Sequence, residues 1–351
     1  MPETTRDFHF AATGIGSVPF GEIEPTCQSI LRATPLIPFW PQFVKRSYRE
    51  DMNIQYTEGL PLLEIQEPSR SLAISPAMDK ENELVRFYDR FLADDLDYFA
   101  ISRDYSAGLY ALGEMIGAGA ARDAPFIKGQ TVGPITFAAS VTDLGGKAVL
   151  YNPELLEAMT KGLSIKALWQ VRELGKSGKK PIIFLDEPYL SGFGSAFSPI
   201  QRHQVIDSIR EVVGYLRERS DALIGIHCCG NTDWSMVIEA GVDIINFDAF
   251  EYLDNFLLYR DDIVRFLAGE GIIAWGIVPT ANFTGNESVE KLLALLEGGF
   301  THLHQWGIDP DLLARRSILT PACGMGTMAF DAARGCLNLL SEISRECGNR
   351  H

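Results

Sequence analysis

The sequence predicts an α/β protein, specifically a (β/α)8 barrel of the TIM type. Short runs rich in β-branched and aromatic residues alternate with longer amphipathic segments along most of the 351 residues. This alternation is typical of a parallel sheet whose strands are joined by helices. Because eight strand-like runs are present, a closed barrel is favoured over an open sheet.

The expected strands follow one another along the chain. They are residues 10–17, 36–40, 126–132, 181–187, 223–229, 243–250, 271–278 and 317–324. Three of the segments between them carry apolar residues at helical spacing, namely 153–178, 200–219 and 288–299. Two further runs, 62–65 and 97–101, compete with 36–40 for the place of the second strand.

Residues 45–120 contain more helical sequence than one strand–helix unit needs. We expect this stretch to form a helical insertion over the mouth of the barrel. No long Pro/Gly/Ser-rich linker and no repeat of fixed period interrupts the chain, so we interpret residues 1–351 as a single domain.

The composition excludes several classes of function. Asp and Glu number 46 against 31 Lys and Arg, and the formal charge of −15 disfavours nucleic-acid binding. No apolar run approaches the roughly 18–20 residues of a membrane-spanning helix, so no membrane association is expected. The first residues do not resemble a secretion signal, which favours a cytoplasmic protein with reduced cysteines.

Polar and reactive side chains are concentrated where the expected strands end. In a barrel, groups at the carboxyl ends of the strands meet around one mouth. His227 and Cys229 are two residues apart on a strand and face the same side, whereas Cys228 faces the helices. The ends of later strands supply Asp248 and Cys323.

One imidazole, two thiols and a carboxylate form a ligand set that suits Zn²⁺ better than Mg²⁺ or Ca²⁺. The four residues are dispersed along the sequence, however, and each also has a structural interpretation. His227 is consistent with a core histidine bonded to a backbone carbonyl, and Cys323 with a residue at the start of a helix. The residues alone leave both interpretations open.

Other polar motifs are similarly ambiguous. Asp186 begins an Asp-Glu-Pro sequence at the end of a strand, where an aspartate often caps the following turn. The sequence Gly-Ile-Gly-Ser at 14–17 is either a tight turn or an anion-binding loop, and it lacks the spacing of a dinucleotide site. We interpret His302 and His304 as surface or packing residues.

Taken in order, several motifs resemble those of the cobalamin-independent methionine synthase family. They are TGIGSVP (13–19), KGQTVGPIT (128–136), FLDEP (184–188), IHCC (226–229), DIINFD (243–248) and LTPACGMG (319–326). The resemblance is to the C-terminal catalytic barrel of that family, within the wider uroporphyrinogen-decarboxylase-like superfamily. It implies a zinc-dependent methyltransferase that methylates the thiol of homocysteine to form methionine.

The resemblance also implies a set of metal ligands. His227, Cys229 and Cys323 match three zinc ligands of the family, and Asp248 stands in place of the family's glutamate ligand. Because the Asp248 side chain is one methylene shorter, Glu251 or an open coordination position remain alternatives for the fourth ligand.

For the substrate, the resemblance implies that the carboxylate of homocysteine is held by Ile15, Gly16 and Ser17. Asp186 matches the aspartate that pairs with the substrate ammonium, and Asp186 and His227 are the predicted catalytic residues. The second carboxylate that the family uses for the ammonium has no clear match, and Glu64 and Glu114 are the candidates.

The methyl donor is less determined. Full-length enzymes of the family have two barrels, whereas short single-barrel relatives take the methyl group from methylcobalamin or a corrinoid protein. With one barrel expected here, we predict a corrinoid donor rather than methyltetrahydrofolate.

The alternative functions are methylation of another thiol such as coenzyme M, a porphyrinogen decarboxylase, and a non-enzymatic corrinoid- or metal-binding protein. The lack of an arginine cluster at the strand ends disfavours the decarboxylase. The oligomeric state, including a homo-oligomer, is left open.

Overall fold

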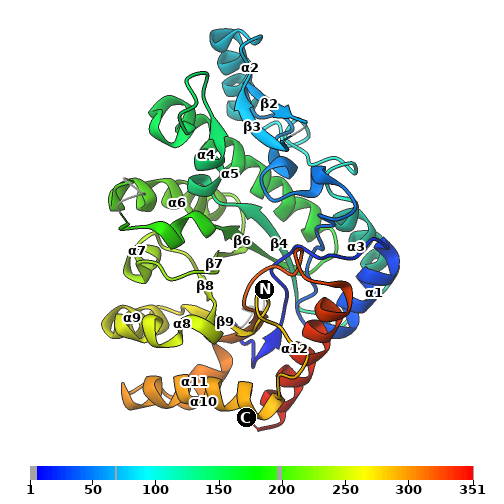
Figure 1. Ribbon diagram of the computed structural model, residues 1–351, viewed down its shortest axis with the longest axis vertical. Helices are drawn as coiled ribbons and strands as arrows, with labels where there is room; N and C mark the ends of the chain where they lie inside the picture. The colour runs from blue at the N-terminus through cyan, green and yellow to red at the C-terminus, as the bar shows by residue number, and fades with distance from the viewer. Residues whose placement is uncertain (1–5, 68, 196–199, 351) are drawn as a thin grey trace.

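The computed structural model describes residues 6–67, 69–195 and 200–350, and its centre is a curved sheet of seven parallel strands (Figure 1). The order along the sheet is β1 (Ala11–Ala12), β10 (Ser317–Pro321), β9 (Ile272–Val278), β8 (Ile244–Phe247), β7 (Leu223–Cys228), β6 (Lys180–Asp186) and β4 (Phe126–Val132). Seven of the eight expected strands are therefore confirmed, and so is their parallel pairing.

The run at 36–40 does not form a regular strand, which corrects that prediction. Pro38 and Pro41 flank Phe39 and Trp40, and a proline has no N–H to donate to a neighbouring strand. The run nevertheless bridges the two edges of the sheet. Trp40 N donates to Lys128 O of β4 (2.9 Å). On the other side, Gln42 N donates to Gly16 O beyond β1 (3.0 Å). The predicted (β/α)8 barrel is thus observed as seven regular strands, with isolated bridges where an eighth strand was expected.

A buried apolar cluster lies near the amino ends of the strands. Every strand of the seven-stranded sheet contributes to it, and its members are Phe8, Ala11, Ile37, Phe126, Ile182, Phe184, Leu223, Ile244, Ile272, Ala274 and Ile318. Because side chains alternate along a strand, residues two and four positions further on share this side. They include Lys128, Gln130 and Asn246, all fully buried. The interior therefore becomes polar toward the carboxyl ends of the strands, where the candidate site lies.

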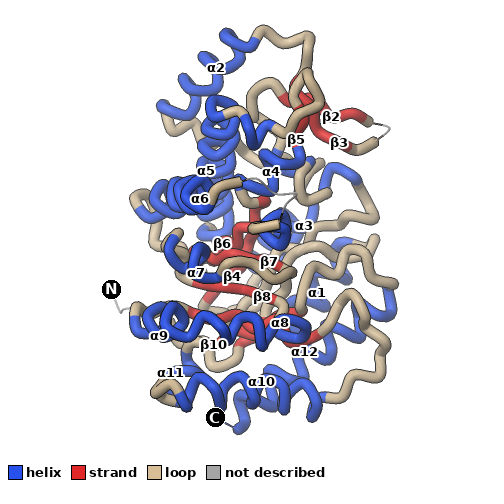
Figure 2. Tube along the Cα trace, turned by 60° about the vertical axis from the view of Figure 1, so that its left-hand side comes forward, coloured by secondary structure: helices blue, strands red, loops and turns tan. Residues whose placement is uncertain are grey.

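Helices surround this sheet, and α5, α8, α10 and α12 pack against its strands (Figure 2). Their bounds are α1 (Ile23–Ala33), α2 (Lys80–Leu92), α3 (Ala107–Gly117), α4 (Pro134–Ser140), α5 (Pro153–Gly175), α6 (Arg202–Arg217), α7 (Trp234–Glu239), α8 (Ala249–Phe256), α9 (Arg260–Ala268), α10 (Val289–Gln305), α11 (Pro310–Arg315) and α12 (Phe330–Arg350). The three helices expected from periodicity are confirmed as α5, α6 and α10. Local signals explain the start of α5, because a proline occupies its first turn and the Asn152 side chain accepts from Leu155 N.

Residues 45–120 contain α2, α3, two short 3-10 helices and a β-hairpin, β2 (Leu63–Gln66) with β3 (Ser71–Ile74). The hairpin belongs to a second sheet with β5 (Val141–Thr142), so the run at 62–65 is a strand but not one of the seven-stranded sheet, and 97–101 is not a strand. The hairpin and α2 lie at the top of Figure 1, away from the central strands. That this stretch covers the mouth, and that the chain is one domain, remain predictions.

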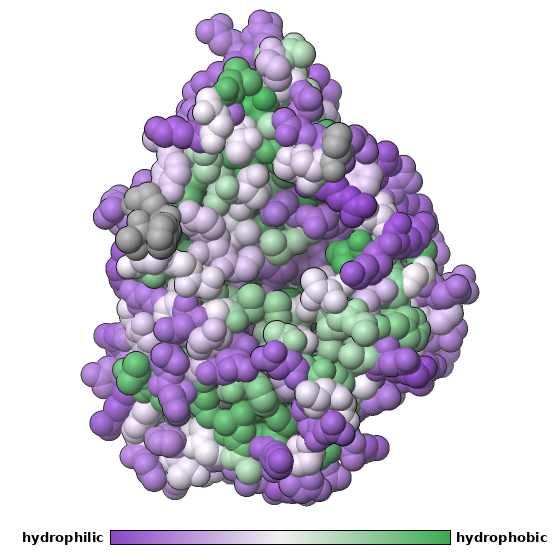
Figure 3. Space-filling view, viewed as in Figure 1, coloured by the Kyte–Doolittle hydropathy of each residue, from purple (hydrophilic) through white to green (hydrophobic). Residues whose placement is uncertain are grey.

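The surface in the same view is largely hydrophilic, with hydrophobic patches over the helices of the lower half (Figure 3). Among the described residues, no helix is both long enough and apolar enough to cross a bilayer.

Candidate metal centre

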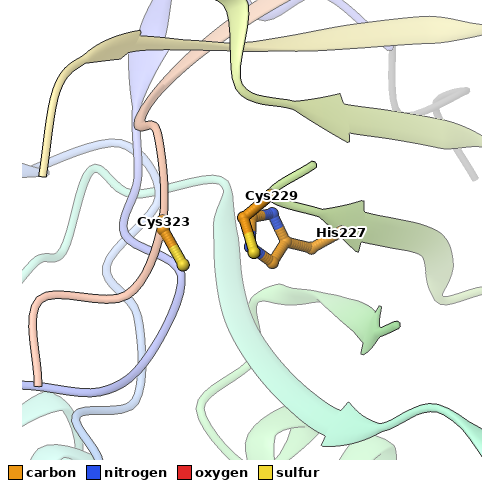
Figure 4. A group of neighbouring side chains, drawn as sticks. All are labelled: His227, Cys229 and Cys323. Atoms are coloured by element: carbon orange, nitrogen blue, oxygen red, sulfur yellow. The ribbon is translucent and has the colours of Figure 1, made fainter. Parts of the chain in front are cut away.

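Three side chains with metal-binding atoms come together at the carboxyl ends of the strands. His227 lies on β7, Cys229 is the first residue after the end of β7, and Cys323 lies just after the end of β10. One ligand atom from each residue lies within 4.8 Å of the others, and Figure 4 shows the Cys323 sulfur turned toward the other two side chains. The expected alternation holds, because the Cys228 thiol is buried elsewhere and donates to Gly230 O (3.5 Å).

The orientation of the imidazole is set by Asn246, a residue that the sequence analysis did not single out. His227 Nδ1 lies 2.5 Å from Asn246 Oδ1. The Asn246 amide nitrogen donates to Ala274 O and to Thr320 Oγ1, both at 2.8 Å. Its oxygen must therefore accept from His227 Nδ1, which leaves Nε2 as the basic nitrogen. Nε2 is buried and has no hydrogen-bond partner among the described residues.

The two thiols interact with one another. A hydrogen bond from Cys323 and the neighbouring His227 lower the pKa of the Cys229 thiol to about 4, although burial opposes this shift. The same contact, together with burial, raises the pKa of the Cys323 thiol well above its ordinary value. Burial alone would lower the pKa of His227, but the adjacent Cys229 and Asp186 raise it. The cluster thus already favours a thiolate beside an imidazole.

These residues fit a zinc ion. Tetrahedral zinc with Zn–S bonds of about 2.3 Å holds its sulfur ligands about 3.8 Å apart, so a small contraction of the cluster suffices. The unpartnered Nε2 also supplies the neutral nitrogen that zinc binds.

The cluster lines a cavity of about 280 Å³ together with Asp186 and Ser17. Asp186 ends β6, its side chain is 5% exposed, and its Oδ1 has no partner among the described residues. Burial raises the pKa of Asp186 to about 6, and the charges of His227 and Lys128 oppose that rise. A buried carboxylate with an unused oxygen is suited to a cationic group of a ligand.

The Asp-Glu-Pro corner divides its roles between two acids. Glu187, not Asp186, stabilises the neighbouring turn, because its carboxylate accepts from Ile135 N (2.9 Å), Thr136 N (2.8 Å) and Thr136 Oγ1 (2.6 Å). These donors lie at the start of α4, where a negative charge is favourable. The cap that the sequence suggested for Asp186 is thus supplied by Glu187, which leaves Asp186 to face the cavity.

Ile15, Gly16 and Ser17 form a tightly held segment at the edge of the cavity. A side chain at Gly16 would meet the Gln42 side chain at 2.5 Å and that of Gln130 at 2.7 Å, so only glycine fits there. Ser17 is tied to the loop that carries Cys323, because Met325 N donates to Ser17 O (2.9 Å) and Gly326 N to Ser17 Oγ (3.3 Å). The segment and the cysteine loop therefore have a fixed relative position.

The predicted acidic ligands lie in different settings. Asp248 is the N-cap of α8 and accepts from Glu251 N (3.0 Å), and it does not belong to the three-residue group. Glu251 is exposed on the first turn of α8. Glu64 is exposed on β2, and Glu114 pairs with an arginine on the outside of α3.

A different carboxylate, that of Asp51, lines the cavity in place of Glu64 and Glu114. The apolar side chains of Val44 and Met52 line it beside Asp51. Sequence reasoning missed Asp51 because it lies in a loop without a strand or helix pattern. His302 and His304 lie on α10 and bond to backbone carbonyls, in agreement with a packing or surface role.

No model of a known protein family matches this chain, and no curated protein matches it. Among solved structures, the chain is similar to a B12-independent methionine synthase from Shewanella sp. W3-18-1 in complex with selenomethionine. The identity is 20%, the match covers 68% of this chain and 67% of that one, and the TM-score is 0.46. It is also similar to a GH113 β-mannanase from Alicyclobacillus acidocaldarius, with 11% identity, 68% and 79% coverage and a TM-score of 0.36.

Proposed function

We propose that this protein is a zinc-dependent methyltransferase that methylates the thiol of homocysteine to form methionine. One observation carries the proposal. A His/Cys/Cys cluster suited to zinc lines the same cavity as Ile15, Ser17 and the buried carboxylate of Asp186, whose Oδ1 has no partner within the described part of the chain. A thiol-binding group and two contacts for an amino-acid group thus share one small space.

For the metal, we propose His227, Cys229 and Cys323 as ligands. Three protein ligands leave one tetrahedral position for a substrate sulfur, as is typical of catalytic zinc sites. When bound, zinc supplies the positive charge that lowers the pKa of a substrate thiol from its usual value of about 8.5 toward neutrality. Asp248 is the alternative proposed occupant of this fourth position, for which it would have to give up its contact with Glu251 N.

For the substrate, we propose that residues 15–17 bind the carboxylate of homocysteine and Asp186 binds its ammonium. Asp51, on the cavity wall, is the proposed second carboxylate in place of Glu64 and Glu114. A cavity of about 280 Å³ lies just below the range of roughly 300–1,000 Å³ that holds drug-sized ligands, so it suits a small amino acid.

For the donor, we propose methylcobalamin or a corrinoid protein, whose methyl group would be presented at the opening of the cavity. The homocysteine sulfur would form a bond to the methyl carbon while the carbon–cobalt bond breaks and both of its electrons stay on cobalt. The thiol proton is released to solvent. Residues that fix the sulfur and the amino-acid end contribute by positioning the reacting atoms in line.

The experiment that tests this proposal crosses two donors with two acceptors and follows methylated product. Methylcobalamin and methyltetrahydrofolate are each combined with homocysteine and with coenzyme M, using protein of measured zinc content. We expect methionine from methylcobalamin and homocysteine, in proportion to bound zinc. Full activity of metal-free protein would overturn the proposal.

A variant of Asp186 distinguishes homocysteine from coenzyme M as the methyl acceptor. Coenzyme M has no ammonium, so Asp186→Asn should raise the KM for homocysteine by about tenfold and leave a coenzyme M reaction unchanged. Product from coenzyme M alone would make it the physiological class of acceptor.

A further inference from the structure

Lys128 is a buried cation in the interior of the sheet that none of the roles above uses. It lies on β4, and its side chain is 0% exposed. Its Nζ donates to Ile15 O (2.6 Å) and to Gln130 Oε1 (3.2 Å), and it lies 4.5 Å from the centre of the Phe184 ring. These contacts place the ammonium directly beneath the segment that lines the cavity.

A buried ammonium is costly unless nearby groups compensate for it. Burial lowers the pKa of Lys128 to about 7, and the charge of Asp186 opposes that shift. Two oxygen acceptors and an aromatic face surround the amino group and offset part of the cost of burial. A methionine or leucine would fill the same space without this cost. The hydrogen bond to Ile15 O is the contact that connects Lys128 to residues 15–17.

That contact determines which way the next peptide group faces. The peptide bond is trans, so the Ile15 carbonyl and the Gly16 N–H point in opposite directions. Because the Ile15 carbonyl points to Lys128, the Gly16 N–H points away from Lys128, and the residues on either side of Gly16, Ile15 and Ser17, both line the cavity.

All three carbonyl oxygens of residues 15–17 are occupied in this way. The donors are Lys128 Nζ to Ile15 O (2.6 Å), Gln42 N to Gly16 O (3.0 Å) and Met325 N to Ser17 O (2.9 Å). Among the residues that the structure describes, neither Gly16 N nor Ser17 N has an acceptor. The segment therefore keeps its oxygens away from a ligand and offers it N–H groups, the arrangement that binds anions.

We propose that Lys128 is a positioning residue that holds the Ile15 carbonyl inward, so that residues 15–17 bind the carboxylate of an α-amino-acid thiol. This inference depends on the proposed function, because it concerns the substrate of the same site. Lys128 itself does not touch the substrate. It confers selectivity for thiols that carry a carboxylate over thiols that lack one.

The test compares two ligands that differ only in the carboxylate, homocysteine and 3-aminopropane-1-thiol. Binding to the zinc-loaded protein is measured by calorimetry for the unaltered chain and for Lys128→Met, which keeps the length and removes the donor. We expect homocysteine to bind about tenfold more weakly to the variant, as for loss of a hydrogen-bonded contact to a charged group. Binding of 3-aminopropane-1-thiol and the zinc content should not change.

Lys166→Met is the matched control. Lys166 is also a fully buried lysine, and its Nζ donates to the backbone oxygen of Phe99 (3.1 Å), but it lies on α5, outside the sheet. This variant should bind both ligands as the unaltered chain does. If Lys128→Met does not fold, Lys128→Gln replaces it, because its shorter side chain cannot span to Ile15 O.

The outcomes separate this inference from the proposed function. Equal weakening of both ligands, or no weakening of either, would overturn the role of Lys128 and leave the proposed function standing. If the unaltered zinc-loaded protein binds 3-aminopropane-1-thiol but not homocysteine, both are overturned.

Discussion

His227 Nδ1 lies 2.5 Å from Asn246 Oδ1, and the Asn246 amide nitrogen is engaged by Ala274 O and Thr320 Oγ1. The asparagine therefore presents its oxygen to the imidazole, and His227 Nε2 is left to face the two thiols. A contact between β7 and β8 thus determines which nitrogen of a candidate ligand is available.

Removing a thiol of the cluster should remove the metal. Cys323→Ser replaces a zinc ligand with a hydroxyl, which zinc binds poorly, so zinc content should fall from about one per chain to near zero, with loss of methyl transfer. Elemental mass spectrometry of the purified protein measures this. Cys228→Ser is the matched control, because Cys228 adjoins Cys229 but bonds to Gly230 O, outside the cluster. Loss of zinc from the control alone would contradict our assignment.

Asn246→Ala should weaken metal binding without removing a ligand. Outer partners that orient a metal-binding histidine typically contribute about 10- to 100-fold in affinity. Thr320→Val removes only a group that accepts from Asn246, so its effect should be smaller. Competition with a chromogenic chelator gives both affinities. An unchanged affinity in Asn246→Ala would show that packing alone orients the imidazole.

Asp248 should act mainly as a helix cap. Asparagine caps as well as aspartate, so Asp248→Asn should leave the free energy of unfolding within about 0.5 kcal/mol, whereas Asp248→Ala should cost about 1 kcal/mol. Urea unfolding measures both. We also expect Asp248→Asn to keep its zinc, because the carboxylate is not part of the three-residue group. Loss of zinc would instead establish Asp248 as the fourth ligand that the sequence predicts.

Glu50 should make stability depend on pH. Its carboxyl is fully buried, and although it accepts from Phe43 N and pairs with Arg46, burial raises its pKa to about 7. The folded protein thus holds a proton that the unfolded chain releases near pH 4.5, so this contribution to stability is present below about pH 4.5 and is lost as pH rises to about 7.

Urea unfolding at pH 5 and pH 7 tests this prediction. Glu50→Gln cannot ionise, so the loss of stability between these values should shrink by on the order of 1–2 kcal/mol. Glu64→Gln, at an exposed position on β2, should keep the dependence of the unaltered chain. An identical slope in Glu50→Gln and the unaltered chain would show that other acids cause it.

Strands were predictable where the local pattern was complete. The run at 126–132 is β4 to the residue, because every one of its side chains is buried and no proline interrupts it. The run at 36–40 has the same apolar character, but Pro38 within it and Pro41 directly after it lack the N–H groups that a strand donates, and only isolated bridges form. The sequence indicated a strand at 62–65, which the structure shows as β2 at 63–66, but not the sheet to which it belongs. That sheet, in the order β2-β3-β5, depends on residues far apart in the sequence.

By itself, the sequence determined which side chains share a face at the end of β7. His227 and Cys229 face one side and Cys228 faces the other, because side chains alternate with a period of two residues along a strand. It also determined that reactive groups follow the strand ends. Only the tertiary structure decided which of them meet. Cys323 joins the pair from β10, Asp248 caps α8, Asp51 enters from a loop, and Lys128 lies beneath residues 15–17. The reason is physical: periodicity is a property of one segment, whereas distances between strand ends depend on how all the strands and helices pack together.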